Sequence, residues 1–340
     1  MRNFAFRKAA TVAEASRAAG LVADTMLSAD GGARSGDVSV VKAGGVDLMD
    51  LMKEGLIAPN EVTSLAGVPG LDAIARTDDG GLSVGSMVTL AKLAADPLVR
   101  ETYPALAEAA GVSASPQIRA AATLGGNLLQ RPRCWYFRSA EFRCLRKGGG
   151  HCYAISGENA YHAIFDNRFC AIVHPSTSAT ALVALGAEVE LVDGDGGSRR
   201  VPLEDFFMRP DRDVQRENDL KAGEILTKVL LPPAAGLRMA HMKLAEKESF
   251  DWPLADVAVA LDLAGALCRR ASIVLGAAAP TPWRAKAAEA VLTGHAVDPD
   301  RAAEAGKAAL QGATPLSDNA YKAPMFEALV KRAILKAVAS

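Results

Sequence analysis

The sequence lacks a hydrophobic run that could cross a membrane, an excess of charge of one sign, and a recognisable export signal. No apolar stretch among its 340 residues approaches the ~20 that a membrane-spanning helix needs. The formal net charge is -1, which gives no electrostatic reason to expect a nucleic acid or an anionic membrane as partner. The N-terminus has no apolar core followed by a small-residue cleavage site. We therefore expect a cytoplasmic chain, or a periplasmic one exported already folded with a signal-bearing partner.

Cysteine is also scarce, and its distribution is uneven. Four of the five cysteines fall between positions 134 and 170, whereas Cys268 stands alone and is expected to be a thiol in the core. Structural disulfides are a weak expectation in a chain without a secretory signal. The clustered cysteines lie in residues 131–170, a segment too long and irregular for an ordinary connection between elements. Long segments of this kind are usually functional or disordered.

The clustered cysteines are four possible thiolate ligands: Cys134, Cys144, Cys152 and Cys170. Four thiolates suit a structural zinc ion or a [4Fe-4S] cluster equally well in principle. Zinc sites usually contain close Cys-x-x-Cys pairs, which are absent here, and the wide spacings favour a loop wrapped around something bulkier. On spacing alone, zinc, a disulfide and unlinked thiols all stay open beside the cluster.

The surroundings of these cysteines favour the cluster. Aromatic residues follow Cys134 directly and would shield such a group from solvent. Basic residues nearby would offset its charge, or would form a rim that docks an acidic partner. The residues are Trp135, Tyr136 and Phe137, and the basic set Arg131, Arg133, Arg138, Arg143, Arg146 and Lys147.

The N-terminal two thirds of the chain alternate between strand and helix patterns. Residues 1–60 predict a small strand–helix–strand–helix unit, with strands at 3–6 and 38–41 and a capping box at Thr11 and Glu14. Asp47 is the expected N-cap of the second helix. Further along, a helix is predicted at 178–184 and strands at 188–192 and 225–231.

The composition changes after Pro232 and Pro233. Three strand-like runs, 238–245, 256–263 and 268–275, predict an antiparallel meander. Thr281 is the expected N-cap of a helix with Pro282 at its first position, and two Ala-rich helices follow. The expected domains are therefore 1–235, with subdomains 1–60 and 61–235 and the insertion 131–170, and a C-terminal α+β domain at 236–340.

Two Gly-Gly motifs are candidate phosphate-binding loops. The first, Lys42-Ala43-Gly44-Gly45-Val46-Asp47-Leu48, joins a strand to a helix, and the second, Ala122-Thr123-Leu124-Gly125-Gly126-Asn127, is expected to be a similar turn. Paired glycines let backbone N–H groups face a ligand, and a helix N-terminus adds partial positive charge, which suits a pyrophosphate. Neither motif matches the dinucleotide fingerprint or a P-loop. Each alone is more typical of a tight turn, and the pair leaves both interpretations open.

The order of the motifs resembles that in the flavin subunits of molybdenum hydroxylases of the xanthine dehydrogenase type. The segments that carry the resemblance are KAGGVDLMDLMK, GSMVTL, PALAEAA and PQIRAAATLGGN. It extends over essentially the whole chain, and the combination is specific although each motif alone is not. The resemblance implies an α+β chain: a two-subdomain FAD-binding fold of the PCMH/vanillyl-alcohol oxidase type, followed by a C-terminal domain of antiparallel strands and helices that helps enclose the isoalloxazine.

The same resemblance implies a set of FAD-binding residues. The first motif would hold the pyrophosphate with main-chain amides, the second would line the other side, and a lysine beside the ring would stabilise negative charge on the reduced flavin. Relatives commonly have an aspartate after His-Pro-Ser, where this chain has Thr177, which can form a hydrogen bond there but brings no charge. The set is Lys42, Ala43, Gly44, Gly45, Val46, Asp47, Leu48, Thr123, Gly125, Gly126, Asn127, Thr177, Leu226 and Lys243.

The cysteine segment resembles an insertion found in two branches of this family. In the aldehyde oxidoreductase and hydroxybenzoyl-CoA reductase branches, four cysteines after the Gly-Gly-Asn motif hold a [4Fe-4S] cluster. The run GENAYHA at 157–163 also resembles the aldehyde branch. The resemblance therefore implies that Cys134, Cys144, Cys152 and Cys170 ligate one cluster.

The implied function is electron transfer within a heterotrimer. A large molybdopterin-binding subunit would oxidise an aldehyde or N-heterocycle, a small [2Fe-2S] subunit would pass the electrons on, and FAD in this chain would deliver them to an external electron acceptor. A self-contained FAD oxidoreductase of the same fold is the main alternative, but residues 166–340 offer no evident substrate base or covalent flavin attachment. A zinc or scaffold module is disfavoured by the intact glycine motifs.

Overall fold

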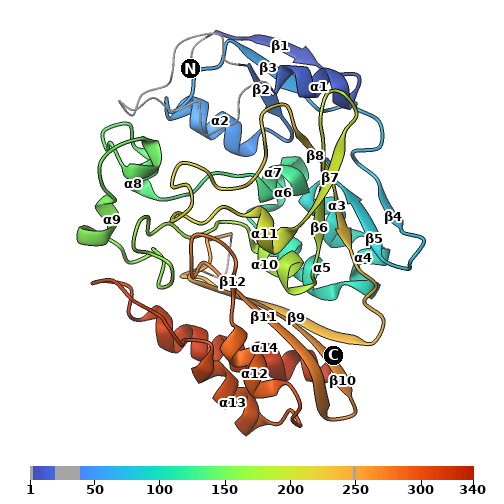
Figure 1. The fold of residues 1–340 in the computed structure, drawn as a ribbon, viewed down its shortest axis with the longest axis vertical. Coiled ribbons are helices and arrows are strands. Elements are labelled where there is room, and N and C mark those ends of the chain that lie inside the picture. The colour runs from blue at the N-terminus through green and yellow to red at the C-terminus, as the bar shows by residue number, and fades with distance from the viewer. Residues whose placement is uncertain (1–2, 20–38, 248–249) are drawn as a thin grey trace.

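The computed structural model describes residues 3–19, 39–247 and 250–340, which form three sheets with helices around them (Figure 1). The sheets are stacked from the N-terminal to the C-terminal end of the molecule. The fold is α+β, as predicted. Of the three sheets, only the first is parallel, and the other two are antiparallel with helices packed beside them.

The first sheet is three-stranded and parallel, in the order β1-β3-β2. The capping box is confirmed: Thr11 accepts a hydrogen bond from the Glu14 amide, and Glu14 accepts one from the Ala10 amide. The first strand begins two residues later than predicted, and residue 38 of the second lies outside the described residues. The elements are β1 (Ala5–Lys8), α1 (Val12–Ala18), β2 (Ser39–Lys42), α2 (Val46–Lys53) and β3 (Glu61–Ser64).

The N-cap prediction for the second helix was wrong. The N-cap is Gly45, with a φ of 87° that favours glycine, and Asp47 is the second residue of α2. The Asp47 carboxylate is therefore available to contact other segments rather than its own helix start.

The second sheet is antiparallel and five-stranded, in the order β4-β5-β8-β6-β7. The predicted strands at 188–192 and 225–231 are confirmed, and the predicted helix at 178–184 begins one residue earlier. Strands are β4 (Ile74–Arg76), β5 (Leu82–Gly85), β6 (Glu188–Val192), β7 (Ser198–Pro202) and β8 (Ile225–Leu231). Helices are α3 (Leu90–Ala95), α4 (Pro97–Thr102), α5 (Pro104–Gly111), α6 (Pro116–Ala121), α7 (Leu124–Leu128), α10 (Thr177–Ala184) and α11 (Leu203–Phe206).

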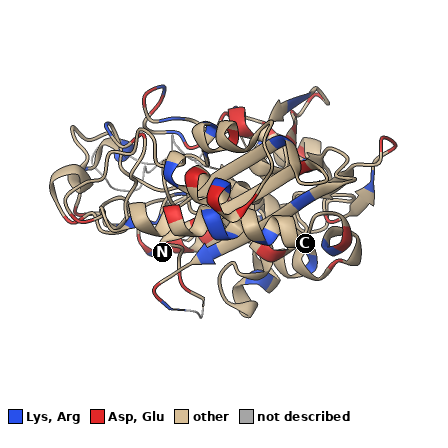
Figure 2. Ribbon diagram, turned by 90° about the horizontal axis from the view of Figure 1, so that it is seen from below, with Lys and Arg blue, Asp and Glu red and all other residues tan. Residues whose placement is uncertain are grey.

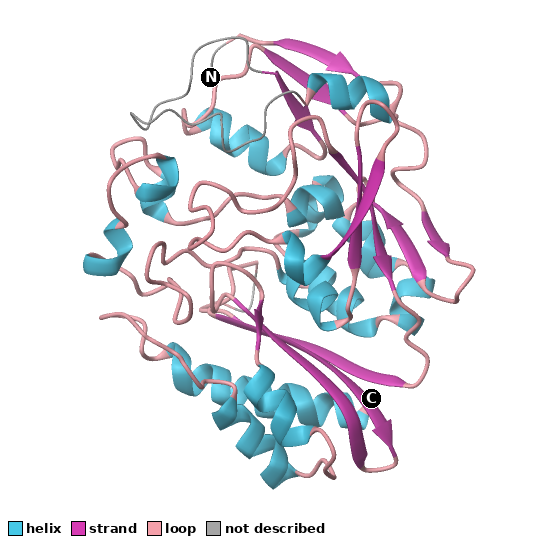
Figure 3. Ribbon diagram, in the orientation of Figure 1, coloured by secondary structure: helices cyan, strands magenta, loops and turns pink. Residues whose placement is uncertain are grey.

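The cysteine segment is mostly irregular and lies at one side of the molecule (Figure 3). It contains only single helical turns: α8 (Trp135–Arg138), the 3-10 turn η2 (Leu145–Lys147) and α9 (Tyr153–Ser156). Its shape therefore depends on side-chain contacts rather than on backbone ladders.

The third sheet is the predicted antiparallel meander, extended by a short fourth strand in the order β12-β11-β10-β9. The prediction that Thr281 starts a helix was wrong, because Trp283 pairs with Leu275 as part of a strand and the helix begins only at Lys286. The elements are β9 (Leu237–Leu244), β10 (Ala255–Ala264), β11 (Leu267–Gly276), β12 (Trp283–Arg284), α12 (Lys286–Leu292), α13 (Pro299–Ala308) and α14 (Lys322–Ala339).

The inner strand β10 of this sheet is buried on both faces. Ala258 and Ala260 belong to the core formed with α5 and α10, whereas Val257, Val259 and Leu261 pack with α12, α13 and α14. Successive side chains of a strand point to opposite faces, so one strand serves both cores. β10 therefore joins the core that contains α10 to the core that contains the C-terminal helices.

Charges of both signs are interspersed over the ribbon (Figure 2). Across the described residues, no helix is long and apolar enough to span a bilayer.

A test of the helix packing compares two glycines in helices. At Gly306 in α13, a Cβ would lie 2.5 Å from the Glu327 carbonyl oxygen of α14, while at Gly111 in α5 the nearest atom would be 3.7 Å away. Alanine normally stabilises a helix relative to glycine by about 1 kcal/mol, but overpacking costs about 1–3 kcal/mol. We expect Gly306→Ala to lower the thermal unfolding midpoint and Gly111→Ala to leave it unchanged or raise it. Equal midpoints would contradict the close approach of α13 and α14.

Candidate functional site

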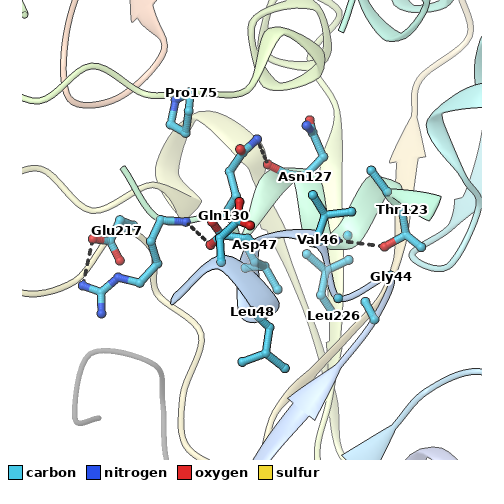
Figure 4. A pocket seen from close by; sticks show the side chains of 18 of the residues that line it. Gly44, Val46, Asp47, Leu48, Thr123, Asn127, Gln130, Pro175, Glu217 and Leu226 are labelled. Carbon is cyan, nitrogen blue, oxygen red and sulfur yellow. Dashed lines mark hydrogen bonds and ion pairs between the residues drawn. The ribbon is translucent and has the colours of Figure 1, made fainter. Parts of the chain in front are cut away.

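A single cavity of about 390 Å³ brings together all the residues predicted to bind the flavin (Figure 4). Both glycine motifs line it, as do residues from α10, β8 and β9. The predicted residues in its wall are Lys42, Ala43, Gly44, Gly45, Val46, Asp47, Leu48, Thr123, Gly125, Gly126, Asn127, Thr177, Leu226 and Lys243. Their convergence from distant parts of the chain defines the candidate site.

The two glycine motifs touch each other at Gly44. A Cβ at this position would lie 2.0 Å from the Ala121 carbonyl oxygen and 3.3 Å from the Ala122 Cα, so only glycine permits this approach. The wall of the cavity therefore forms where β2 runs into α2 beside the turn between α6 and α7.

The first motif presents the start of a helix to the cavity. The first backbone hydrogen bond of α2 is donated by the Met49 amide to the carbonyl of the N-cap, Gly45. The amides that precede it, those of Val46, Asp47 and Leu48, therefore have no partner within the helix. These amides and the helix dipole suit an anionic group.

The second motif is built differently from the prediction. Gly125 and Gly126 lie inside the short helix α7 rather than in a loop, and Thr123 is its N-cap. The Gly125 amide donates to the Ser86 carbonyl at 2.8 Å and the Gly126 amide donates to Thr123 Oγ1 at 3.2 Å. The amides of both glycines are therefore hydrogen-bonded within the protein. This motif contributes to the cavity as a tightly packed part of its wall.

The side chain of Asp47 binds the segment that follows the second motif. It accepts hydrogen bonds from the Arg131 amide at 2.9 Å and from Arg138 at 2.6 Å, and it pairs with Arg133 at 3.0 Å. Asp47 thus joins α2 to the beginning of the cysteine segment.

Lys243 has a fixed position in the cavity wall. Its ammonium group donates to the Val112 carbonyl at 3.1 Å and to the Asp251 carbonyl. Burial lowers the pKa of Lys243, whereas the carboxylates of Asp256 and Asp251 oppose that shift. A cation held in this way suits a ligand that accumulates negative charge.

Thr177 is the first residue of α10 and is only 4% exposed. Its hydroxyl donates to the Ala109 carbonyl at 3.1 Å and is also hydrogen-bonded to Ser113. The neighbouring N-cap Ser176 is hydrogen-bonded to the Asn127 side-chain oxygen. The hydroxyl of Thr177 is therefore committed to the protein rather than held ready for a ligand.

Several lining residues were not predicted. Arg131, 2% exposed, forms an ion pair with Glu217 at 3.0 Å, and both line the cavity. Trp252, in the connection between β9 and β10, lines it as well and lies under the Arg133 guanidinium at 5.1 Å. The position of Arg131, just after the Gly-Gly-Asn motif, was a usable signal. No local sequence pattern identifies Glu217 or Trp252 as residues of the cavity wall.

The four clustered cysteines meet at a second, much smaller pocket. All five cysteines of the chain are free thiols. The rest of the pocket lining is Tyr136, Phe137, Leu145, Arg146, Tyr153 and Ile172. The structure thus brings together the predicted ligands Cys134, Cys144, Cys152 and Cys170, and it leaves Cys268 buried elsewhere, in the C-terminal core.

The cysteines differ in their electrostatic surroundings. Burial raises the pKa of Cys134 to about 12 and also raises that of Cys144. A hydrogen bond from the Cys152 thiol lowers the pKa of Cys170, and the buried Arg146 guanidinium adds to that effect. A bound cation would be needed to hold all four as thiolates in this apolar setting.

The four clustered thiols are possible ligands of a metal centre. In the described part of the chain, no three Cys, His, Asp or Glu side chains are arranged to hold one metal ion. In a tetrahedral zinc site, each of the four sulfur atoms lies about 2.3 Å from the zinc ion. Four thiols around a shared pocket are also a donor set of the kind that can hold a [4Fe-4S] cluster.

Four basic residues of this segment form contacts inside the protein rather than an external rim. Arg131 and Arg146 are both 2% exposed and share the Glu217 carboxylate, at 3.0 and 2.8 Å. Arg138 pairs with Asp47 and Glu54, and the buried Lys147 donates to the Ser139 carbonyl. The hypothesis of a basic docking rim was therefore wrong for these residues, which neutralise carboxylates and carbonyls inside the protein.

Comparison with known families defines the class of protein. Residues 7–234 match the model of the FAD binding domain in molybdopterin dehydrogenase, and residues 240–337 match the CO dehydrogenase flavoprotein C-terminal domain. The chain belongs to this family: it is an FAD-binding oxidoreductase subunit of the molybdenum hydroxylase type.

Individual relatives agree with this assignment. The chain is 37% identical over 253 residues to the aldehyde oxidoreductase FAD-binding subunit PaoB of Escherichia coli, covering 74% of this chain and 78% of that one. A solved structure of carbon monoxide dehydrogenase from Hydrogenophaga pseudoflava has a TM-score of 0.75 at 26% identity, over 99% of this chain and 98% of that one. Quinoline 2-oxidoreductase from Pseudomonas putida 86 has a TM-score of 0.73 at 25% identity, with the same coverage.

The contact at Gly44 gives a test of the cavity wall. Alanine there would push α2 away from the Ala121 carbonyl and separate the two motifs. We expect purified Gly44→Ala protein to lose most of its flavin, measured by absorbance after denaturation, while Gly111→Ala keeps it. Full flavin content in Gly44→Ala would contradict a ligand site at this junction.

The internal hydrogen bonds of Thr177 predict a modest effect of its removal. Losing one net hydrogen bond costs about 1 kcal/mol. Thr177→Ala should therefore weaken FAD binding by roughly five- to tenfold at most, measured by fluorescence titration of the deflavinated protein. Complete loss of binding would show that Thr177 makes a direct and essential contact.

Proposed function

We propose that this chain is the FAD- and [4Fe-4S]-containing electron-transfer subunit of a heterotrimeric molybdenum hydroxylase. The observation that carries the proposal is the presence, in one chain of this family, of the flavin cavity and a pocket ringed by Cys134, Cys144, Cys152 and Cys170. Arg146, hydrogen-bonded to both Cys170 and Glu217, links the second pocket to the wall of the first.

FAD is proposed to lie between the two glycine motifs. The amides at the start of α2, from Val46 to Leu48, would bind the pyrophosphate, and the α7 wall from Thr123 to Asn127 would close the other side. Leu226 and Lys243 would lie beside the isoalloxazine. When bound, the flavin accepts and releases electrons. The protein contributes geometry and the fixed cation of Lys243.

The domain limits at 60 and 235 are part of the proposal. The last strand of the second sheet ends at Leu231 and the first strand of the third begins at Leu237, which supports a boundary between them. The third sheet would then belong to the domain that helps enclose the flavin ring.

The partners are proposed to be a large molybdopterin-binding subunit and a small [2Fe-2S] subunit, with an external electron acceptor. One relative is named as a subunit of an aldehyde oxidoreductase, and the carbon monoxide dehydrogenase structure was solved without the Mo-pyranopterin moiety of its molybdenum cofactor. With quinoline 2-oxidoreductase also similar, we propose an aldehyde or an N-heterocycle as the substrate of the complex. A self-contained FAD oxidoreductase is less well supported, because the C-terminal domain matches that of a subunit.

The metal content of the purified chain tests the cluster. Anaerobically purified protein should contain FAD, about four iron atoms per chain and negligible zinc and molybdenum. Replacing any of Cys134, Cys144, Cys152 and Cys170 by serine should lose or degrade the cluster, and Cys268→Ser, which changes a thiol in a different core, should not. Metal analysis and the visible absorption spectrum measure both. Stoichiometric zinc would contradict the cluster.

The division of labour is tested with the same preparation. The lone chain should not oxidise an aldehyde or a purine, and activity should appear only when both partner subunits are restored. Turnover by the isolated chain would contradict the proposed role as an electron-transfer subunit.

A further inference from the structure

His162 directs a ring nitrogen at one of the proposed cluster ligands. Its Nε2 lies 3.2 Å from Cys134 Sγ, within hydrogen-bonding distance for sulfur. The imidazole is 3% exposed, and the Trp135 ring lies edge to face with it at a centroid distance of 5.0 Å. Water therefore does not compete for this nitrogen.

The backbone of His162 is fixed from the C-terminal domain. Its carbonyl accepts hydrogen bonds from Lys322 Nζ at 3.1 Å and from Asn319 Nδ2 at 3.2 Å, and its amide donates to Asn159 at 2.9 Å. Lys322, Asn319 and Asn159 are each 0% exposed. These bonds fix where the side chain starts, and the rings of Trp135 and Tyr136 pack against the buried imidazole and limit its rotation away from Cys134.

The second ring nitrogen indicates which atom carries the proton. His162 Nδ1 is buried and has no hydrogen-bond partner. If Nδ1 carried the hydrogen, a buried N–H donor would be left unsatisfied, which costs about 1–3 kcal/mol. If Nε2 carries it, the hydrogen points at Cys134 and only a weak acceptor is left unpaired. A thiolate at Cys134 accepts but cannot donate, so a metal-ligated Cys134 requires the hydrogen on Nε2.

We infer that His162 donates a hydrogen bond from Nε2 to the Cys134 sulfur and thereby raises the reduction potential of the cluster. This inference rests on the proposed function, since it requires Cys134 to be a cluster ligand. A one-electron reduction places more negative charge on the ligating sulfurs, and a hydrogen-bond donor stabilises that charge. His162 is thus a positioning residue that sets how readily the cluster takes an electron.

The test is an EPR-monitored redox titration of the complete, anaerobically purified protein, with iron and sulfide assays on every sample. His162→Phe removes the donor and keeps a ring, whereas His162→Gln keeps an N–H close to the Nε2 position. We expect His162→Phe to shift the reduction equilibrium about tenfold toward the oxidised cluster, ~59 mV for a one-electron couple. His162→Gln should remain close to the wild type.

A matched control comes from the other histidine of the segment. His151 is exposed, and its ring lies tilted against the Tyr153 ring at a centroid distance of 4.1 Å. His151→Phe makes the same chemical change one residue from Cys152 and should leave the potential unchanged. An unchanged potential in His162→Phe with full iron, or an equal shift in His151→Phe, overturns the inference.

A measurement on the wild type covers the case in which His162→Phe fails to assemble. The wild-type protein is labelled with ¹⁵N-histidine and reduced with dithionite. Pulsed EPR should then show a weak coupling between the reduced cluster and one histidine nitrogen. Its absence in iron-replete wild type overturns the inference and leaves the cluster standing. Absence of iron from the wild type overturns the proposed cluster itself, and the inference with it.

Discussion

The Asp47 carboxylate is the constraint on which the arrangement of both sites depends. It lies in the first turn of α2, beside the amides that face the flavin cavity, and it holds Arg131, Arg133 and Arg138. These three residues flank Cys134. A single side chain therefore sets where the cysteine segment begins relative to the start of α2. With a side-chain exposure of 16%, its ion pairs are screened less than surface pairs.

A second carboxylate, Glu217, completes the connection. It lies between the buried guanidinium groups of Arg131 and Arg146, and Arg146 also contacts Cys170. The hydrogen bond from Cys152 and the Arg146 guanidinium both lower the pKa of Cys170. Glu217 and Arg146 therefore connect the cysteine pocket to the wall of the larger cavity.

Local sequence signals predicted the elements that depend on local chemistry. The Thr11 and Glu14 capping box, the C-terminal meander and the grouping of four cysteines could be predicted because each follows from spacing or pattern. Thr281 was misassigned because the pairing of Trp283 with Leu275 is a tertiary contact that overrides a favourable helix start. Gly45 rather than Asp47 is the N-cap because the chain enters α2 through a left-handed backbone conformation that favours glycine. Glu217 could not be predicted, since its role comes from arginines far away in sequence.

The central claim is that one chain holds FAD between its glycine motifs and an iron–sulfur cluster among its four clustered cysteines. A crystal structure of the anaerobically purified protein, with anomalous data on both sides of the iron edge, tests it most directly. The account predicts flavin density against the amides of Val46, Asp47 and Leu48, and iron peaks enclosed by Cys134, Cys144, Cys152 and Cys170. Flavin density outside that cavity, or anomalous signal only at the zinc edge among those cysteines, would contradict it.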